Sequence, residues 1–141
     1  MSDSNAQRAQ VQPEVQPQSR PDGEPVIRTI AMPSDTNPNG DIFGGWLMAQ
    51  MDLAGGSAAV RRARGRVATV AVDSMSFHHP VKVGDEVSIY ARILGVGRTS
   101  LRIFLEAWAR GRDGGMNKVT SATFVFVAIG ADGRPRVVDP P

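Results

Sequence analysis

A chain of 141 residues is the size of one domain, and 41% hydrophobic residues are enough to fill a core of ordinary size. The formal net charge of +2 identifies no class of partner, and the absence of cysteine excludes disulfide bonds, thiol catalysis and thiolate metal sites. No N-terminal stretch has a basic start followed by an apolar run, and residues 44–60 are too short and too polar to span a membrane. We therefore expect a soluble, cytoplasmic protein with no membrane segment.

The first 25 residues differ in composition from the rest of the chain. They contain five Gln, four Pro and no aromatic residue, which predicts a disordered tail followed by one domain over residues 26–141. Residues 26–32 are rich in β-branched side chains and end at Pro33, which predicts a short strand. A loop is predicted over residues 34–43, because this stretch contains a proline and a glycine.

Residues 44–64 predict a helix whose side chains are apolar or small on nearly every side. Residues at helical spacing include Leu47, Met51, Ala54 and Ala58. A helix that is apolar around its whole circumference is typical of a buried element. Gly55 and Gly56 each lower its intrinsic stability by roughly 1 kcal/mol relative to alanine, so its surroundings must hold it. Gly65 is the expected stop.

Four strands are predicted after this helix, over residues 67–77, 87–96, 101–110 and 119–129. The loops between them are short, which favours antiparallel neighbours. In the third of these strands one face carries Leu101, Ile103, Leu105, Ala107 and Ala109, so that face is expected to be dry. The order strand, helix and four antiparallel strands predicts an α+β fold with a sheet curled around one apolar helix, and it leaves the strand order open.

The run from Asn39 to Trp46 places a carboxylate and two glycines at the predicted start of the helix. Gly44 and Gly45 would present free backbone N–H groups at the positive end of the helix dipole, where developing negative charge is stabilised. Asp41 lies just upstream and is a candidate base or nucleophile, so the run predicts two parts of a hydrolase that acts on an acyl group. The alternative is that Asp41 or Asn39 only caps the helix.

A longer stretch around this run resembles the opening motif of the bacterial acyl-CoA thioesterases of the YciA-like hotdog group. The motif covers residues 32–56 and includes Asn37-Pro38-Asn39-Gly40-Asp41-Ile42-Phe43-Gly44-Gly45-Trp46. Further likeness is found in residues 66–70, 75–77, 80–85 and 97–100, so the resemblance covers about residues 26 to 138. A pattern of this length is far more specific than a short glycine motif.

The resemblance implies a hotdog fold, with about five antiparallel strands in a curved sheet wrapped around a central helix. It implies hydrolysis of acyl-CoA to free CoA and a carboxylic acid, with CoA as part of the substrate and no separate cofactor. It also implies a homodimer or a hexamer built as a trimer of dimers, with active sites between subunits. The family's catalytic acidic position falls on Asp41, and a second acidic position of related eukaryotic cytosolic thioesterases matches Asp52.

The chemistry of a thioester agrees with these residues. Its carbonyl is electrophilic enough that a held water or carboxylate and an oxyanion donor suffice. Asp41 acts either as a general base on water or as a nucleophile that forms a mixed anhydride, and the sequence leaves both open. The N–H of Gly44 or Gly45 would polarise the carbonyl, and Asn37 or Asn39 would orient the water.

Three residues of the helix region have two interpretations each. Asp52 is a carboxylate in an apolar stretch, so it either faces the active-site cavity of the dimer or makes a structural hydrogen bond to a neighbouring subunit. Phe43 and Trp46 either line the acyl pocket or belong to the core.

Two polar segments of the chain are candidate binding sites. Arg98, Thr99 and Ser100 lie between two predicted strands and either bind the phosphates of CoA or form an ordinary hairpin turn. The arginines within residues 61–66 are not interleaved with aromatic residues, so they predict a solvated helix end and no nucleic-acid partner.

His78 and His79 predict no metal site, because adjacent strand residues point to opposite faces and the chain has no other histidine. His78 is at best a lining residue. Two other functions compete with the thioesterase. A non-catalytic acyl-CoA-binding hotdog module would not need a carboxylate at Asp41, and a hotdog dehydratase would need a histidine in a matching motif.

Overall fold

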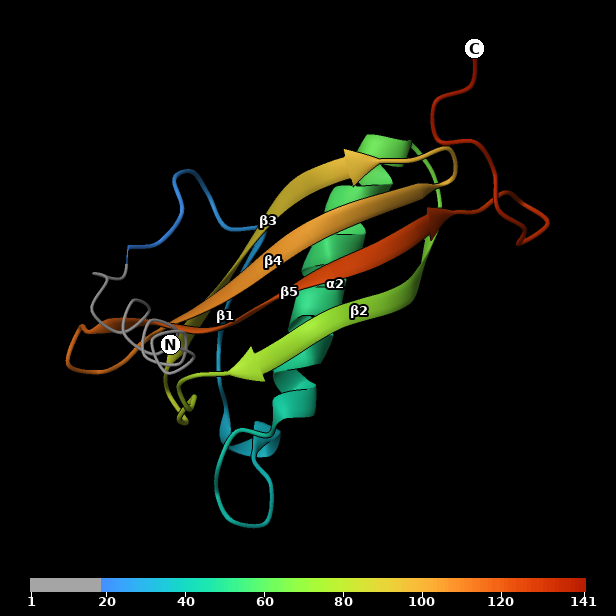
Figure 1. Cartoon of the computed structure of the whole chain (residues 1–141). Coiled ribbons are helices and arrows are strands. Elements are labelled where there is room, and N and C mark those ends of the chain that lie inside the picture. Colours follow the sequence, from blue (N-terminus) through green and yellow to red (C-terminus); the bar gives the residue numbers. More distant parts are fainter. Residues whose placement is uncertain (1–18) are drawn as a thin grey trace, which may run out of the picture.

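The structure is a computed structural model and describes residues 19–141. The chain forms strand β1 (Ile27–Ile30), a short 3-10 helix η1 (Pro33–Asp35), helix α2 (Gly44–Ala63) and four long strands. These strands are β2 (Val67–Phe77), β3 (Glu86–Val96), β4 (Ser100–Arg110) and β5 (Met116–Ala128). The observed elements follow the predicted order, with η1 as an addition inside the segment expected to be only a loop. The curved sheet lies across the single long helix, as the hotdog prediction requires (Figure 1).

All five strands form one antiparallel sheet in the order β1-β3-β4-β5-β2. The β3–β4 and β4–β5 hairpins were predicted correctly from their short loops. The expectation that β2 and β3 are also neighbours is wrong, because β2 pairs with β5 and forms one edge. Residues 78–85 join β2 to β3 across the end of the sheet. Three strand spacings are about 14 Å, and a linker of this length reaches roughly 25 Å, so the crossing is easily made.

The core lies between the concave face of the sheet and one face of α2. The predicted dry face of β4 is buried as expected, and Phe124 and Phe126 of β5 lie beside it. Leu47, Met51 and Ala54 pack from the helix into this layer. A Cβ added at Gly55 would lie 2.8 Å from Leu105 Cδ1 and 2.9 Å from Phe126 Cζ. The close packing of the helix on β4 and β5 therefore requires glycine at position 55. This explains why the helix contains Gly55 although glycine weakens it.

The helix is not buried on every side within the single chain, which corrects the prediction from its composition. Leu53 is 62% exposed, and Met48 and Val60 are also exposed. The adjacent edge strand β2 exposes Val70 (57%) and Phe77 (48%) as well. Residues 19–141 of one chain therefore leave an apolar surface along α2 and β2, because none of their other elements covers the second helix face.

The helix ends one residue earlier than predicted. Arg64, with φ of 55°, adopts the left-handed conformation, and its N–H donates to the carbonyl of Val60. Gly65 has a different role: a Cβ there would lie 2.5 Å from Nη2 of Arg136, which donates to the carbonyl of Ala63 at 2.7 Å. Glycine thus gives room for the close approach of a guanidinium and is not needed for the backbone turn.

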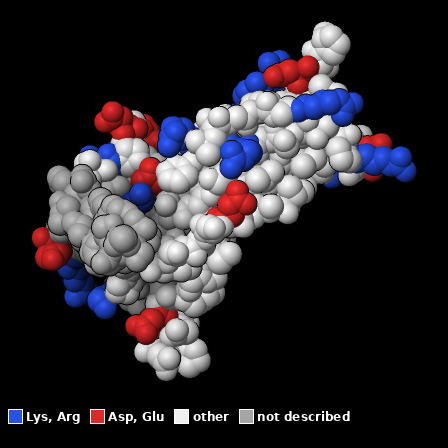
Figure 2. Space-filling model, viewed as in Figure 1, with Lys and Arg blue, Asp and Glu red and all other residues white. Residues whose placement is uncertain are grey.

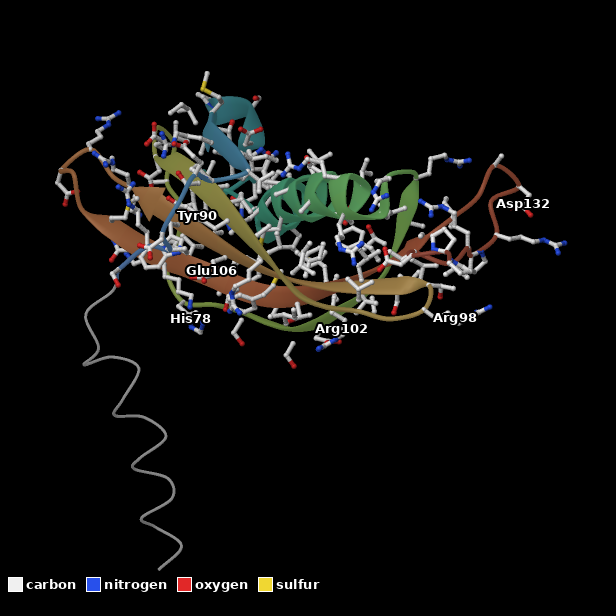
Figure 3. The ribbon with its side chains drawn as sticks, turned by 90° about the horizontal axis from the view of Figure 1, so that it is seen from above. His78, Tyr90, Arg98, Arg102, Glu106 and Asp132 are labelled. Atoms are coloured by element: carbon white, nitrogen blue, oxygen red, sulfur yellow. The ribbon has the colours of Figure 1, made fainter. Side chains whose placement is uncertain are left out.

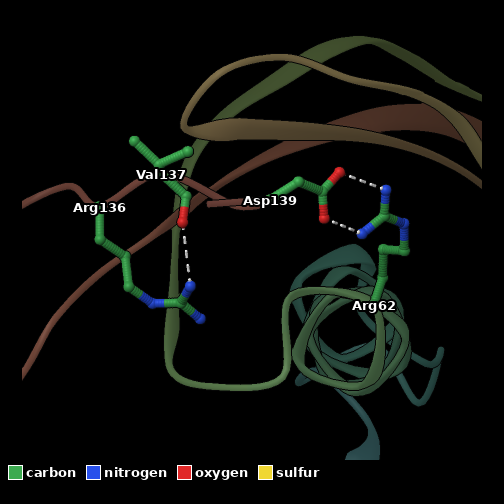
Figure 4. A network of polar contacts seen from close by, with 4 residues as sticks. All are labelled: Arg62, Arg136, Val137 and Asp139. Atoms are coloured by element: carbon green, nitrogen blue, oxygen red, sulfur yellow. Dashed lines mark hydrogen bonds and ion pairs between the residues drawn. The ribbon is translucent and has the colours of Figure 1, made fainter. Parts of the chain in front are cut away.

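A C-terminal segment is tied to the end of α2 by charged contacts. Arg62 donates two hydrogen bonds of 2.8 Å to the carboxylate of Asp139, and Arg136 also donates to the carbonyl of Val137 (Figure 4). The hydrogen bond from Arg62 is the main cause that holds the pKa of Asp139 below its ordinary value. Arg66 donates to the carbonyl of Gly130. Arginines of the predicted solvated helix end therefore hold this segment in place.

The predicted tail is only partly covered by the structure. Residues 1–18 lie outside the described residues. Residues 19–25 contain no helix or strand, and Pro21, Asp22 and Glu24 border a cavity of about 380 Å³ on β3 and β4. The N–H of Val26 donates to the carbonyl of Ile89, so the first sheet contact is made at the predicted start of the domain.

Candidate active site

Asp41 lies on a loop with a defined internal structure. Residues 37–40 form a turn in which the N–H of Gly40 donates to the carbonyl of Asn37, and Gly40 has φ of 84°. An isolated β-bridge between Thr36 and Ile42 closes the loop. Figure 1 shows this loop projecting beyond the N-terminal end of α2. Asp41 is thus exposed on a braced loop and does not belong to the core.

Asn37 organises this loop. Its Oδ1 accepts hydrogen bonds from the N–H groups of Asn39 (2.9 Å) and Asp41 (3.1 Å), and its own N–H donates to the carbonyl of Asp41 at 2.7 Å. The carboxylate-bearing residue is therefore fixed through its backbone. Asn39 is exposed at the tip of the turn. The structure gives Asn37 a positioning role that the sequence did not predict.

The first turn of α2 carries no side-chain cap. The N-cap residue is Phe43, which has an extended backbone and makes no capping hydrogen bond through its side chain. The interpretation of Asp41 or Asn39 as a helix cap is therefore wrong, since each residue lies outside the cap position. Gly44 and Gly45 occupy the first two helical positions, where backbone N–H groups have no intrahelical acceptor. The positive end of a 20-residue helix is left free to meet an anion or an oxyanion.

A cavity of about 440 Å³ lies against this helix start. It is bordered by the end of the loop, the first turn of α2, the end of β2 with its following linker, and the beginning of β5. Its lining residues are Ile42, Phe43, Gly44, Leu47, Phe77, His78, His79, Pro80, Val81 and Val119. Most of these side chains are apolar, and Asp41 directly precedes the first of them. The cavity therefore joins an apolar space to a free helix N-terminus.

Phe77 is the functional candidate that sequence reasoning missed. A Cβ at Gly44 would lie 3.3 Å from Cζ of Phe77, so the ring rests on the backbone of the first helical residue. Phe77 ends β2, and Val119 begins the buried part of neighbouring β5. Both residues are visible as apolar strand positions in the sequence. Their meeting at the helix start depends on the β5–β2 pairing, which the sequence left open.

The two aromatic candidates for the acyl pocket, Phe43 and Trp46, lie in different environments. Phe43 lines the cavity and remains 42% exposed. Trp46 is half-buried and packs against the core, so the structure does not bring it into the cavity. Gly45 lies beside the ring of Phe43, with its Cβ position 3.3 Å from Cδ2, and does not border the cavity itself.

Asp52 lies outside this cavity in the single chain. Its Oδ1 accepts a hydrogen bond of 2.6 Å from the hydroxyl of Thr69 on β2. It borders a second, open cavity of about 460 Å³ between α2 and β2, together with Leu53, Gly56 and Val60. The predicted alternatives were a catalytic cavity and a bond to a neighbouring subunit. The structure adds a partner in the same chain, on the apolar surface of α2 and β2.

Arg98, Thr99 and Ser100 lie at the opposite end of the sheet from the helix start. Figure 3 shows Arg98 at one end of the sheet and His78 near the other. β4 has 11 residues, so these ends are separated by roughly 33 Å. The carbonyls of Arg98 and Thr99 accept hydrogen bonds from Val138 and Ala128. One chain therefore does not bring this turn to the cavity that Gly44 borders.

His78 and His79 follow β2 and both line the cavity. The ring Nδ1 of His79 lies 3.0 Å from the carbonyl oxygen of Pro80. Within residues 19–141 no group of three or more His, Cys, Asp or Glu side chains is placed to hold a metal ion. In the same described part of the chain, no helix is long and apolar enough to cross a membrane.

Comparison with known proteins decides the family. Residues 39–115, which include Asp41, α2 and strands β2, β3 and β4, match the model of the Thioesterase superfamily. The chain belongs to the thioesterase superfamily. It is 52% identical over 120 residues to the acyl-CoA thioester hydrolase YciA of Salmonella typhimurium, covering 82% of this chain and 90% of that relative. It is 50% identical over 122 residues to YciA of Escherichia coli strain K12, covering 84% and 92%.

Solved structures of thioesterases have the same fold. The hexameric thioesterase y2039 from Yersinia pestis superposes with a TM-score of 0.81 at 49% identity, covering 86% of this chain and 100% of that chain. A hexameric broad-specificity acyl-coenzyme A thioesterase, HI0827, gives a TM-score of 0.82 at 48% identity, with coverage of 86% and 85%. The likeness to the YciA group and the hotdog fold are both confirmed for this thioesterase-superfamily chain.

Proposed function

We propose that this chain hydrolyses acyl-CoA thioesters to free CoA and a carboxylic acid. The observation that carries the proposal is the uncapped start of α2, with Gly44 bordering an apolar cavity and Asp41 on the braced loop beside it. The names of the relatives, acyl-CoA thioester hydrolases, support the same activity. They favour a hydrolase over a non-catalytic acyl-CoA-binding module.

The geometry suggests how the reaction would proceed. The acyl chain would lie in the cavity, with its carbonyl oxygen accepting a hydrogen bond from the N–H of Gly44 or Gly45. Water, deprotonated by Asp41, or the Asp41 carboxylate itself adds to the carbonyl carbon, and charge develops on the oxygen at the helix N-terminus. The C–S bond then breaks, and CoA leaves as a thiolate that takes up a proton. In the nucleophilic route, water hydrolyses the resulting mixed anhydride.

This sequence of steps balances without any redox or group-carrying cofactor. CoA enters as part of the substrate and leaves as product, so no separate cofactor is proposed. We also propose a cytoplasmic location, which suits a chain without cysteine and an intracellular class of substrate.

We propose that the active unit is a homodimer, assembled further into a hexamer. The apolar surface along α2 and the edge strand β2 supports the dimer, because an unpaired strand edge beside exposed apolar side chains favours pairing with another copy. Antiparallel pairing of two β2 strands would bring the Arg98 turn of one copy toward the helix start of the other. Arg98, Thr99 and Ser100 could then contact CoA from the second copy. The hexameric relatives support the larger assembly.

The test is release of free thiol from a series of acyl-CoA chain lengths by the wild type, Asp41→Asn and Asp41→Ala. We expect both variants to lose at least about 100-fold in kcat, since removal of a general base or nucleophile has effects of this size. CoA binding, measured by calorimetry, should persist. Asp132→Asn is the matched control, because Asp132 is an exposed carboxylate in the C-terminal turn. Wild type without thiol release for any chain length contradicts the activity, and full turnover in Asp41→Ala contradicts the role of Asp41.

A further inference from the structure

We propose that a polar cavity beside the acyl cavity receives the phosphate groups of CoA, with Lys82 and Arg112 as the binding cations. This inference rests on the proposed hydrolysis of acyl-CoA. The polar cavity has a volume of about 520 Å³ and lies between the β2–β3 linker and the β4–β5 hairpin. His79 and Pro80 border both cavities, so the two spaces are adjacent.

The two cations come from different loops that pack against each other. Gly84 has φ of 92°, and a Cβ there would lie 3.8 Å from Nε and 3.9 Å from Nη2 of Arg112. The guanidinium of the hairpin therefore rests on the turn that carries Lys82, in which the N–H of Asp85 donates to the Lys82 carbonyl. Figure 2 shows basic and acidic side chains gathered at this end of the molecule, where the β4–β5 hairpin lies.

The carboxylates of the polar cavity already have backbone partners. Oδ2 of Asp85 accepts the N–H of Lys82 at 3.0 Å, and Asp85 is buried with 9% exposure. Oδ1 of Asp113 accepts the N–H of Gly115 at 2.9 Å. These carboxylates stabilise the two turns. Among residues 19–141, neither the Lys82 ammonium nor the Arg112 guanidinium has an ion-pair partner.

The substrate's shape matches this arrangement. In acyl-CoA the acyl chain and the phosphate-bearing end extend from opposite sides of the thioester. With the acyl chain in the apolar cavity and the carbonyl at Gly44, the phosphate-bearing end can pass over His79 and Pro80 into the polar cavity. A guanidinium and an ammonium are the side chains best suited to phosphate oxygens. This places a phosphate site on the same chain as Gly44, in contrast to the Arg98 turn at the far end.

The experiment compares Lys82→Ala and Arg112→Ala with the wild type on two substrates: an acyl-CoA, and the same acyl group on N-acetylcysteamine, which has the thioester but no phosphate. For acyl-CoA we expect KM to rise about tenfold in each variant with kcat unchanged, the size expected from losing one charge-assisted hydrogen bond. For the N-acetylcysteamine thioester, kcat/KM should not change. Calorimetric titration with free CoA should show a dissociation constant about tenfold weaker in each variant. Arg134→Ala is the matched control, since Arg134 is an exposed arginine in the C-terminal turn.

The calorimetry separates this inference from the proposed function. If the wild type binds CoA and both variants bind it more weakly, the phosphate site stands even if no thioester is hydrolysed. If both variants bind CoA as tightly as the wild type, the inference is overturned whatever the activity. It is also overturned if both substrates lose activity equally, because a phosphate contact cannot affect a substrate without phosphate.

Discussion

At the scale of single residues, the carboxylates Asp41 and Asp52 differ in how they are held. Asp41 is fixed only through its backbone, by the side chain of Asn37, and its carboxylate is exposed beside a free helix start. Asp52 is half-buried and its carboxylate is engaged by Thr69. A group that must react needs access to the substrate, whereas a group with a short hydrogen bond on a packing surface stabilises that surface. The structure therefore distinguishes two carboxylates that are both candidates for the active site in the sequence.

This difference predicts the stability and activity of two variants, one at Asp52 and one at its hydrogen-bond partner Thr69. Asp52→Asn retains an oxygen that accepts the hydrogen bond from Thr69. The kcat of this variant should therefore stay within about threefold of the wild-type value, and its free energy of unfolding should change by less than about 0.7 kcal/mol. Thr69→Val removes the hydroxyl that donates to Asp52 in an exposed hydrogen bond and should lower the free energy of unfolding by about 0.5–1.5 kcal/mol. Urea unfolding and thiol release measure both quantities. A loss of 100-fold or more in kcat for a stable Asp52→Asn would assign Asp52 to the reaction.

At this scale, local sequence information was sufficient to place Asp41, Gly44 and Phe43 together, because all three lie within a few residues of one helix start. Phe77 could not be found in the same way. Its contact with Gly44 joins residues that are far apart in the chain and depends on which strand lies beside the helix. The role of Asn37 could not be predicted either. An asparagine in a loop can hydrogen-bond to the backbone of its own loop or to a water, and the sequence does not distinguish these two possibilities.

At the scale of elements, α2 shows why a helix can carry glycines at its centre. Gly55 faces Leu105 and Phe126 at distances that leave no room for a methyl group, while a Cβ at Gly56 would make only an ordinary contact, 3.8 Å from Phe126. Two adjacent residues of the same type thus serve different purposes. The first sets the distance between helix and sheet, and the second lies toward the open surface of α2 and β2.

We predict that Gly55→Ala lowers the free energy of unfolding by about 1–3 kcal/mol, because overpacking of the core outweighs a gain in helix propensity of roughly 1 kcal/mol. Gly56→Ala is the matched control and should be neutral or slightly stabilising within the chain. Urea unfolding, followed by circular dichroism on samples of equal oligomeric state, measures both. A Gly55→Ala protein as stable as the wild type would show that the helix can shift away from the sheet at little cost.

The elements were predicted well because their signals are local. The alternation along β4 and the apolar pattern of α2 each extend over a single element, and the observed bounds follow them. The strand order was not predictable from the same signals. The β2–β3 linker has a length that permits either a hairpin or a crossing, and only the pairing of β2 with β5 settles which occurs.

At the scale of the whole molecule, the incomplete burial of α2 is the main departure from the sequence prediction. An apolar helix was expected to be covered all round, and the described residues of one chain cover only the face toward the sheet. The apolar composition of α2 thus indicates that its outer face is buried, and residues 19–141 of a single chain do not bury it. A second copy across α2 and β2 would supply it, and would also bring an Arg98 turn to each helix start.

This arrangement predicts that Leu53→Asp breaks the assembly. Leu53 is 62% exposed in one chain, so the substitution leaves the internal packing intact, but it would bury an unpaired carboxylate against the second copy. We expect light scattering to give the mass of a single chain, and thiol release to fall together with the mass because each site needs two copies. Leu94→Asp is the matched control: Leu94 is an exposed leucine on β3, which β4 and β5 separate from the edge strand β2, and this variant should remain at least a dimer. A Leu53→Asp protein that keeps the wild-type mass would place the interface on another surface and leave the exposed face of α2 without its proposed partner.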